Sequence, residues 1–363
     1  MTNDGLGNAK KGKNDEFYTL YHDIEKELNA YLEYDPDVFR GKTVLLPCDD
    51  PEWSNFTKYF AQKFETLGLK KLISTSFAPK SKLNHDYQPT LFETESPAFD
   101  KSKSQTNGKI FTLTRDATGD GAINVDDLEW SYLKGDGDFR SDEIKTLRDE
   151  ADVVITNPPF SLFTEFLSWI AVAEKKFLII GNINCITYKE VFSLIMQNRV
   201  WLGNGMGRWI SGFIVPDSYE LYGTEARVED GKRIVSTNNA LWLTNLEHGR
   251  RHAPLSLMTM EENKRFSKHS NVKGVGYLKY DNYDAIEAPF TDAIPSDYQG
   301  AIGVPISFLD KYNPDQFELL GMSGNGKMPP AFLIPGQDKY DRPYLNGARM
   351  YVRLFIRHKK LSD

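Results

Sequence analysis

The chain has 363 residues, which is enough for two domains, and its 40% hydrophobic and 26% charged content is that of an ordinary globular protein. Its two cysteines, Cys48 and Cys185, lie far apart without metal-ligand spacing, which argues against a disulfide framework or a zinc site and favours a cytoplasmic protein. No apolar run is long enough to cross a membrane, so we expect no membrane partner. The net charge of −7 is uneven, because residues 84–142 hold 12 Asp/Glu against 6 Lys/Arg, whereas residues 320–363 hold 8 Lys/Arg against 3 Asp/Glu. The acidic segment is therefore excluded as a phosphate-binding surface, while the basic one is not.

The N-terminal part of the sequence alternates short apolar runs with segments whose apolar side chains recur at helical spacing. This alternation is typical of an α/β domain with a largely parallel sheet. The expected elements are a flexible tail at 1–14, a helix that starts at Asp15 or Thr19 and runs to about Leu32, a strand at 43–48, a helix at 54–67 and a strand at 71–77.

Residues 78–135 interrupt the alternation with acidic, turn-rich sequence, which predicts an insertion with one hairpin formed by 110–113 and 122–125. Beyond about residue 200 the helical periodicity weakens, which predicts a β-rich region over 201–363 and a first domain over 15–200. The elements expected between these two regions are a helix at 144–150, a strand at 152–156, a helix at 162–173 and a strand at 177–180.

The tetrapeptide Asn157-Pro158-Pro159-Phe160 directly follows the expected strand at 152–156. A proline-rich turn explains the end of a strand but not an aromatic at the carboxyl edge of a parallel sheet, where ligands bind. The Asn157 side-chain oxygen and the Pro158 carbonyl can accept both N–H bonds of an adenine amino group and so free the nitrogen lone pair for attack. Because this contact strengthens as positive charge develops on nitrogen, it favours the transition state. Phe160 can stack on a base that has been flipped out of a duplex.

These four residues resemble motif IV of the amino-methyltransferases, the (D/N/S)PP(Y/F/W) signature, in which the asparagine form with phenylalanine is commoner in adenine enzymes. The motif also occurs in protein-glutamine and some RNA methyltransferases, so the motif alone leaves the substrate open. The resemblance implies catalytic roles for Asn157, Pro158, Pro159 and Phe160.

The loop after the first strand is less typical of an S-adenosylmethionine site, because it has no glycine-rich turn. Two interpretations stay open: Asp50 or Ser54 caps a helix, or Asp49 or Asp50 faces the methionine ammonium near a helix N-terminus. The cofactor-binding residues predicted in this loop are Cys48, Asp49, Asp50, Pro51, Ser54, Asn55 and Phe56.

Two further segments resemble elements of the γ class of DNA amino-methyltransferases. Phe17-Tyr18-Thr19 resembles the element that lines the methionine end of the cofactor. Asp138-Phe139 resembles the pair whose carboxylate accepts from the cofactor adenine and whose ring packs against it, although a solvated turn acid would also explain Asp138. The chain order of these elements and the later Asn157 motif is the γ-class order.

Several long segments between about residue 10 and the C-terminus carry a more specific resemblance. They include DEFYT (15–19), CDDPEWSNFTKYF (48–60), TNPPFSLF (156–163), FLIIGNINCITYKEVF (177–192), SGFIVPDSYELYGTEAR (211–227) and GVPISFLDKYNPDQFELLG (303–321). With these segments the chain resembles the EcoRI-type adenine-specific methylases. The resemblance implies a monomeric bacterial or phage enzyme that uses S-adenosylmethionine to methylate the N6 position of adenine in double-stranded DNA. Pairing with a restriction endonuclease is one role that stays open.

Candidate DNA contacts are of residue types that read base edges or phosphates. In the expected last strand at 350–358, Arg353 and Arg357 fall on a face with two aromatics, for which an ordinary solvent-exposed strand face is the competing explanation. The predicted DNA-binding residues are Arg208, Arg227, Asn238, Asn239, Arg353 and Arg357.

A calcium loop is a weaker possibility, because Asp116, Asp120 and Asp127 have EF-hand-like spacing in a single copy that ends in Asp rather than Glu. We expect an acidic hairpin turn there instead, and no metal site.

Together these features predict a Rossmann-like S-adenosylmethionine-dependent methyltransferase sheet with an acidic insertion, followed by a β-rich target-recognition region. The predicted function is site-specific adenine methylation of DNA. The alternatives are a protein-glutamine methyltransferase of the same fold and a DNA-binding protein that has lost catalysis.

Overall fold

The computed structural model describes residues 18–49, 54–78, 91–205, 210–215, 226–236, 239–324, 332–338 and 341–359. The chain divides into unit 1, formed by residues 1–183 and 205–246, and unit 2, formed by residues 184–204 and 247–363. Residues 205–246, which the sequence predicts to be part of the β-rich second region, thus belong to unit 1. The expected tail at 1–14 lies outside the described residues. Among the described residues, no helix is long and apolar enough to span a bilayer.

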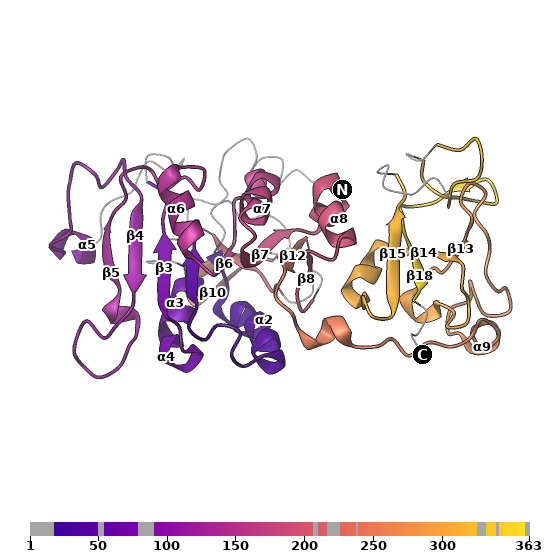
Figure 1. Ribbon diagram of the computed structural model, residues 1–363, viewed down its shortest axis with the longest axis horizontal. Helices are drawn as coiled ribbons and strands as arrows, with labels where there is room; N and C mark the ends of the chain where they lie inside the picture. The colour runs from indigo at the N-terminus through magenta and orange to yellow at the C-terminus, as the bar shows by residue number, and fades with distance from the viewer. Residues whose placement is uncertain are drawn as a thin grey trace. The chain divides into compact units, whose positions relative to one another are not determined.

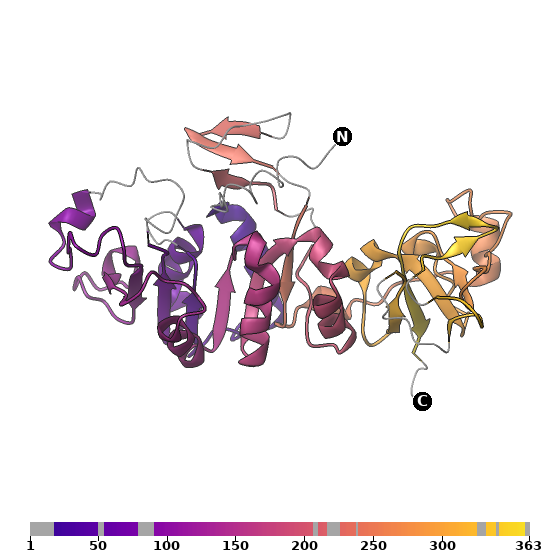
Figure 2. The same ribbon diagram turned by 90° about the horizontal axis from the view of Figure 1, so that it is seen from above.

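Unit 1 is built on a mixed sheet whose strands follow the order β5-β4-β3-β2-β6-β7-β12 (Figures 1 and 2). Strands β2, β3, β6 and β7 are parallel, and β4, β5 and β12 add to them in antiparallel pairs. These strands are β2 (Thr43–Leu46), β3 (Lys71–Thr75), β4 (Lys109–Leu113), β5 (Glu129–Tyr132), β6 (Val153–Thr156), β7 (Lys176–Asn182) and β12 (Ala240–Thr244). The α/β class expected from the sequence is therefore confirmed.

Strand β3 pairs with one edge of β2, and β6 pairs with the other edge. The order of the strands in the sheet therefore reverses at β2. The carboxyl ends of β2 and β6 lie side by side at this reversal, which is where open α/β sheets bind ligands. The helices of unit 1 are α2 (Tyr21–Tyr34), α3 (Asn55–Gln62), α4 (Phe64–Leu67), α5 (Leu91–Glu95), α6 (Asp142–Glu150) and α7 (Phe163–Val172). The segment Phe160–Leu162 is a 3₁₀ turn.

The core of unit 1 forms where α2 and α3 pack on the sheet. Ile24 and Leu28 of α2, Phe56 and Phe60 of α3 and Leu46 of β2 are buried in one apolar cluster. Burial of each such side chain stabilises the fold by about 1.5–3 kcal/mol. This packing fixes the start of α3 beside the carboxyl end of β2.

The expected insertion extends the sheet at its edge through β4 and β5. The first strand of the expected hairpin is confirmed at 109–113, but the second lies at 129–132 and not at 122–125. The Asn124 side chain accepts from the backbone N–H of Asp126 and caps a 3₁₀ turn at 125–127, which prevents the extended conformation there.

A second, small sheet of unit 1 has the strand order β1-β9-β11-β10. All its neighbouring strands are antiparallel, and Thr19 pairs with Phe213. Its strands are β1 (Tyr18–Thr19), β9 (Phe213–Val215), β10 (Ala226–Glu229) and β11 (Lys232–Val235).

Unit 2 contains a four-stranded sheet with the order β13-β14-β18-β15 (Figure 1). A separate hairpin joins β16 to β17. The β-rich character expected for the C-terminal region is visible here. The elements of unit 2 are α8 (Lys189–Met196), β8 (Trp201–Leu202), α9 (Met260–Phe266), β13 (Ala285–Glu287), β14 (Ala301–Pro305), β15 (Phe317–Met322), β16 (Tyr344–Leu345), β17 (Ala348–Arg349) and β18 (Arg353–His358).

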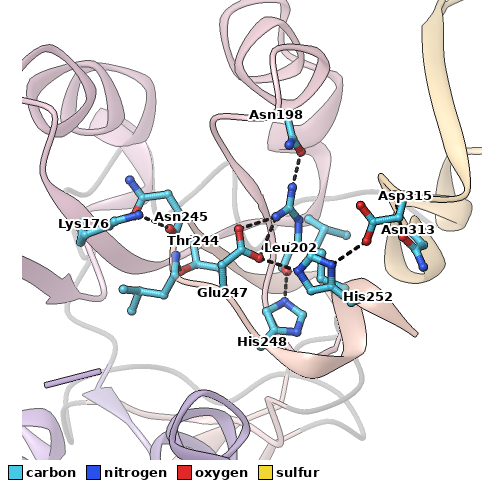
Figure 3. A network of polar contacts seen from close by, with 12 residues as sticks. Lys176, Asn198, Leu202, Thr244, Asn245, Glu247, His248, His252, Asn313 and Asp315 are labelled. Atoms are coloured by element: carbon cyan, nitrogen blue, oxygen red, sulfur yellow. Dashed lines mark hydrogen bonds and ion pairs between the residues drawn. The ribbon is translucent and has the colours of Figure 1, made fainter. Parts of the chain in front are cut away.

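A polar network in unit 2 surrounds Arg251 and His252 (Figure 3). Arg251 donates to Glu247 at 2.7 Å and lies 3.6 Å from the centre of the Trp201 ring. His252 contacts Glu247 through Nε2 at 3.0 Å and Asp315 through Nδ1 at 2.8 Å. The contacts of His252 with Glu247 and Asp315 therefore connect the 3₁₀ turn at 249–252 to the segment that precedes β15.

Candidate functional site

The carboxyl ends of β2 and β6 bring two of the predicted motifs together. Pro47, Cys48 and Asp49 follow β2, and Asn157 follows β6. The Thr156 hydroxyl at the end of β6 donates to the Pro47 carbonyl, so the two loops leave the sheet joined to one another. Pro158 is buried, whereas Asn157 is half-buried, and its side-chain oxygen faces the protein interior.

The loop after β2 holds a buried carboxylate. Asp49 is 4% exposed, and the Ser54 hydroxyl donates to it at 2.8 Å. The same hydroxyl accepts from the Phe56 backbone N–H at 3.1 Å, which confirms Ser54 as the cap of α3. One serine therefore starts the helix and orients Asp49. Asp50 and Pro51 lie outside the described residues.

Cys48 connects this loop to the predicted Asp-Phe pair. Its backbone has φ +65°, a strained conformation for a residue with a Cβ. Burial, and then the nearby carboxylates of Asp49 and Asp138, raise the pKa of the Cys48 thiol well above its usual range. The sulfur therefore lies within electrostatic reach of both acids, although they are far apart in sequence.

The loop that carries Asp138 is positioned by Gly137, which has φ +87°. A Cβ at this position would lie 2.3 Å from the Ser76 carbonyl, so only glycine allows the loop to approach the end of β3. The Asp138 carboxylate accepts from Arg140 Nε at 2.9 Å, and this contact holds the pKa of Asp138 below its ordinary value.

The Phe139 ring is buried against α7, with centroid distances of 5.0 Å to Phe166 and 5.7 Å to Trp169. The structure gives this ring a packing role, and its contact with a cofactor stays a prediction. Phe56 is buried in the same way, with its ring 6.0 Å from Trp242 of β12.

The predicted N-terminal element is attached to α3. Asn55 Nδ2 donates to the Thr19 carbonyl at 2.8 Å, and both side chains are buried. Tyr18 and Thr19 form β1, which adds to β9. Phe17 lies outside the described residues.

Phe213 of β9 links this element to the Asn157 motif. Its main chain pairs with Thr19, and its ring meets the Phe160 ring edge-on at a centroid distance of 6.2 Å. Two motifs that are distant in sequence, at residues 18–19 and 160, thus meet at one phenylalanine, and Asn55 is connected to it through Thr19.

The segment before Phe213 is held by a buried acid. Asp23 of α2 is 2% exposed and accepts from the Ser211 backbone N–H at 2.8 Å and from the Ser211 hydroxyl at 3.0 Å. Burial raises the pKa of Asp23 despite these hydrogen bonds. We call this pair the Asp23–Ser211 contact, and it fixes the start of β9.

Sequence reasoning missed Asp23, Ser211 and Phe213. One signal was present, because Asp23 falls on the apolar face of its helix beside Ile24, where an uncompensated acid is unexpected. The segment 211–227 carries part of the family resemblance, but no pattern in it assigned a role to Ser211 or Phe213.

The predicted DNA-binding residues have different surroundings in the structure. Arg227 donates to the Ser211 carbonyl at 3.3 Å and to the Ser236 hydroxyl, so it supports β9. Asn239 is exposed. Arg357 is partly exposed and pairs with Glu318 at 2.6 Å. Arg208 and Asn238 lie outside the described residues.

Arg353 requires a correction. It is 9% exposed and forms an ion pair with the equally buried Glu287 at 2.8 Å, and Phe355 beside it is fully buried. Alternation predicted one solvent face for this strand, but the first four residues of β18 are all buried. We therefore no longer consider Arg353 a DNA contact.

The carboxylates of the calcium-like loop accept backbone N–H groups. Asp127 accepts from Ala117, Thr118 and Asn124 at 2.9 Å each, and Asp116 accepts from Gly121 at 2.8 Å. Within the part of the chain that the structure describes, no three metal-ligating side chains form a candidate metal site.

Comparison with known proteins gives consistent matches over the whole length. The family model described as "Adenine-specific methyltransferase EcoRI" matches residues 5–359. The chain is 46% identical over 362 residues to Type II methyltransferase M.EcoRI of Escherichia coli, covering 99% of this chain and 98% of the relative. It is 32% identical to Type II methyltransferase M.MpnI of Mycoplasma pneumoniae, covering 97% of both chains. No solved structure matches significantly.

Proposed function

Because the chain belongs to the EcoRI family of adenine-specific methyltransferases, we propose that the carboxyl edge of β2 and β6 is where it methylates adenine at a specific site in DNA. The observation that carries this proposal is the position of Asn157 directly after β6, next to the loop that holds the buried Asp49. The reversal of strand order at β2 further supports a Rossmann-like methyltransferase sheet, in which this edge binds ligands.

The tetrapeptide after β6 supplies the chemistry on the acceptor side. The Asn157 side-chain oxygen and the Pro158 carbonyl accept from the two N–H groups of the adenine amino nitrogen. The lone pair of that nitrogen is then free to attack, and both contacts strengthen as positive charge develops on it. Pro158 and Pro159 restrict the backbone, so the acceptors are oriented before the substrate arrives.

Phe160 holds the base from the side. We infer that adenine leaves the duplex and stacks on this ring, because a base within the helix is out of reach. Phe213 packs edge-on against Phe160 and limits its movement. No side chain with a tuned pKa is needed as a base, since the nitrogen becomes acidic only after it has been methylated.

The donor set at the end of β2 fits S-adenosylmethionine. When bound, this cofactor supplies an electrophilic methyl group. The carboxylates of Asp49 and Asp138, which both lie near the Cys48 thiol, suit the ammonium, hydroxyl or adenine amino groups of such a ligand. The residues that would hold it are Phe17, Tyr18, Thr19, Cys48, Asp49, Asp50, Pro51, Ser54, Asn55, Phe56, Asp138, Phe139 and Asn157.

Unit 2 is the proposed target-recognition region. Unit 1 carries 26 Lys/Arg against 36 Asp/Glu, whereas unit 2 carries 18 Lys/Arg against 15 Asp/Glu. Only unit 2 therefore has the charge sign that favours binding to a polyanion. We further propose that the enzyme acts as a monomer on double-stranded DNA in the cytoplasm, with a restriction endonuclease as its functional counterpart.

The test is to incubate the protein with S-adenosylmethionine and unmethylated duplex DNA and to measure methylated nucleosides by mass spectrometry. We expect N6-methyladenine from the wild type and none from Asn157→Ala, while Asn29→Ala, an exposed position on α2, retains full activity. N4-methylcytosine alone would contradict the choice of base. Cofactor binding without any methylated base would favour a protein or RNA substrate, and near-normal turnover by Asn157→Ala would exclude the assigned site.

A further inference from the structure

An acid-free basic segment begins near the end of helix α9 in unit 2. Residues 264–279 contain five Lys/Arg and no Asp/Glu, in a protein whose net charge is −7. All five cationic side chains are exposed. They are Lys264, Arg265, Lys268, Lys273 and Lys279. Glu261 and Glu262 lie in the first turn of α9, so the excess of positive charge begins in its last turn, where it is a candidate contact for a polyanion.

The backbone folds this segment into a compact shape. The Gly274 N–H donates to the Lys264 carbonyl at 2.8 Å, and the Lys273 N–H donates to the His269 carbonyl at 2.9 Å. Gly274 has φ +77° and allows the tight return. Lys273 therefore comes back beside Lys264 at the C-terminal end of α9. We call residues 264–276 the basic knob, and it begins in α9 at the periphery of unit 2 (Figure 1).

The cations of the basic knob can exchange their carboxylate partners for phosphates. Arg265 pairs with Glu261 at 2.9 Å and Lys268 with Asp292 at 2.7 Å, but all four side chains are at least half exposed. Such surface pairs contribute about 0–1 kcal/mol, so a phosphate can replace the carboxylates. Among the described residues, no carboxylate lies within ion-pair distance of Lys264 or Lys273.

An exposed aromatic side chain lies among these cations. Phe266, the last residue of α9, is 69% exposed, and Val275 in the returning segment is 57% exposed. Large apolar side chains next to lysines occur where a protein contacts nucleic acid, because the cations bind phosphates while the ring covers sugars or base edges.

We propose that the basic knob binds the backbone of duplex DNA, with Lys264 and Lys273 on phosphates and Phe266 against the adjacent groove. The proposal rests on DNA being the substrate, as proposed above. It adds a contact surface in unit 2 to the predicted DNA-binding residues. The knob positions the duplex through charge and carries no sequence information of its own.

The decisive variant is the double change Lys264→Gln/Lys273→Gln, measured by fluorescence anisotropy with duplex DNA over a range of salt concentrations. The logarithm of the binding constant falls as log salt rises, and each lost phosphate contact makes this slope less steep by about 1. We therefore expect the slope of the variant to be less steep than that of the wild type by about 2. The KM for DNA should rise, while kcat at saturating DNA stays unchanged.

The matched control is Lys42→Gln/Lys70→Gln in unit 1, where a backbone hydrogen bond of 2.9 Å also brings two exposed lysines together. The control should leave the salt slope unchanged. A third variant, Phe266→Ser, should weaken binding at every salt concentration without changing the slope, because no charge is lost. Thermal melting of each variant confirms that it is folded.

The outcomes separate the two proposals. A wild-type slope in the Lys264→Gln/Lys273→Gln variant, or an equal loss in the Lys42→Gln/Lys70→Gln control, overturns the basic knob while methylation of DNA by the wild type keeps the proposed function. A wild-type protein that neither binds nor methylates duplex DNA overturns both. A slope decrease restricted to the knob variant supports the phosphate contact.

Discussion

Two buried carboxylates, one in each unit, have different principal donors. In unit 1, Asp23 accepts from the backbone N–H and the hydroxyl of Ser211, which are neutral donors, and lies 3.1 Å from Nε2 of the exposed His22. In unit 2, Glu287 accepts from the guanidinium of Arg353 through Nε at 3.1 Å and Nη2 at 2.8 Å, and the Tyr280 hydroxyl donates to it as well. Both acids are almost fully buried, at 2% and 6% exposure.

The Asp23–Ser211 contact and the Glu287–Arg353 ion pair have different structural roles. Burial raises the pKa of Asp23, so its charge costs stability at neutral pH, and the cost is tolerated where the acid fixes β9 next to Phe160. Glu287 holds two strands and a tyrosine together with its charge neutralised. Unit 1 thus uses a buried acid to position a site, and unit 2 uses one to build a scaffold.

The largest expected effect comes from removing the cation in unit 2. Arg353→Met leaves Glu287 buried and unpaired and should lower the free energy of unfolding by about 3–5 kcal/mol in urea titrations. The double variant with Glu287→Leu should recover most of this loss. Arg357→Gln, which breaks only the partly exposed pair with Glu318, should change stability by less than about 1 kcal/mol. A small effect of Arg353→Met would show that the pair is not a structural element.

A smaller effect is expected in unit 1, but it should appear in catalysis. Ser211→Ala removes the hydroxyl from Asp23 and should cost about 1–2 kcal/mol of stability. Because β9 positions Phe213 against Phe160, we expect kcat to fall about tenfold, equivalent to about 1.4 kcal/mol, with the dissociation constant of the cofactor unchanged. Ser168→Ala, at an exposed position of α7, is the control. An unchanged kcat would mean that the Asp23–Ser211 contact serves stability alone.

The smallest effect is a pH dependence in the network of unit 2. Hydrogen bonding to Asp315, followed by that to Glu247, raises the pKa of His252 above its ordinary 6.5. The stabilisation is therefore complete below pH 6.5 and is lost as the pH rises through the raised value. Because the side chains are partly exposed, it amounts to less than about 1 kcal/mol. His252→Gln should abolish this pH dependence in urea titrations at pH 5.5 and 8.5, and an unchanged profile would exclude His252 as its source.

The elements that carry their own periodicity were predictable from the sequence. The strand expected at 152–156 is β6 at Val153–Thr156, and the helix expected at 162–173 is α7 at Phe163–Val172. The position of Asn157 at the carboxyl edge followed from them. The single helix expected at 54–67 is divided at Lys63 into α3 and α4.

Long-range pairings were not predictable, because no local signal specifies them. Strand β9 has three residues, and its partner β1 lies almost two hundred residues earlier in the chain. β12 returns from beyond residue 200 to pair with β7, so the boundary between the units could not be placed by periodicity. The alternation rule placed Arg353 on an exposed face, because its buried partner Glu287 is visible only in the folded chain.

The surroundings of the two cysteine thiols have a practical consequence for handling the protein. Burial and two neighbouring carboxylates keep the Cys48 thiol protonated by raising its pKa, and burial raises the pKa of Cys185 to about 12. Oxidation and alkylation attack the thiolate, which is nearly absent at neutral pH in both residues. We therefore expect both thiols, including the half-buried Cys48, to react with iodoacetamide more slowly at neutral pH than a free cysteine does.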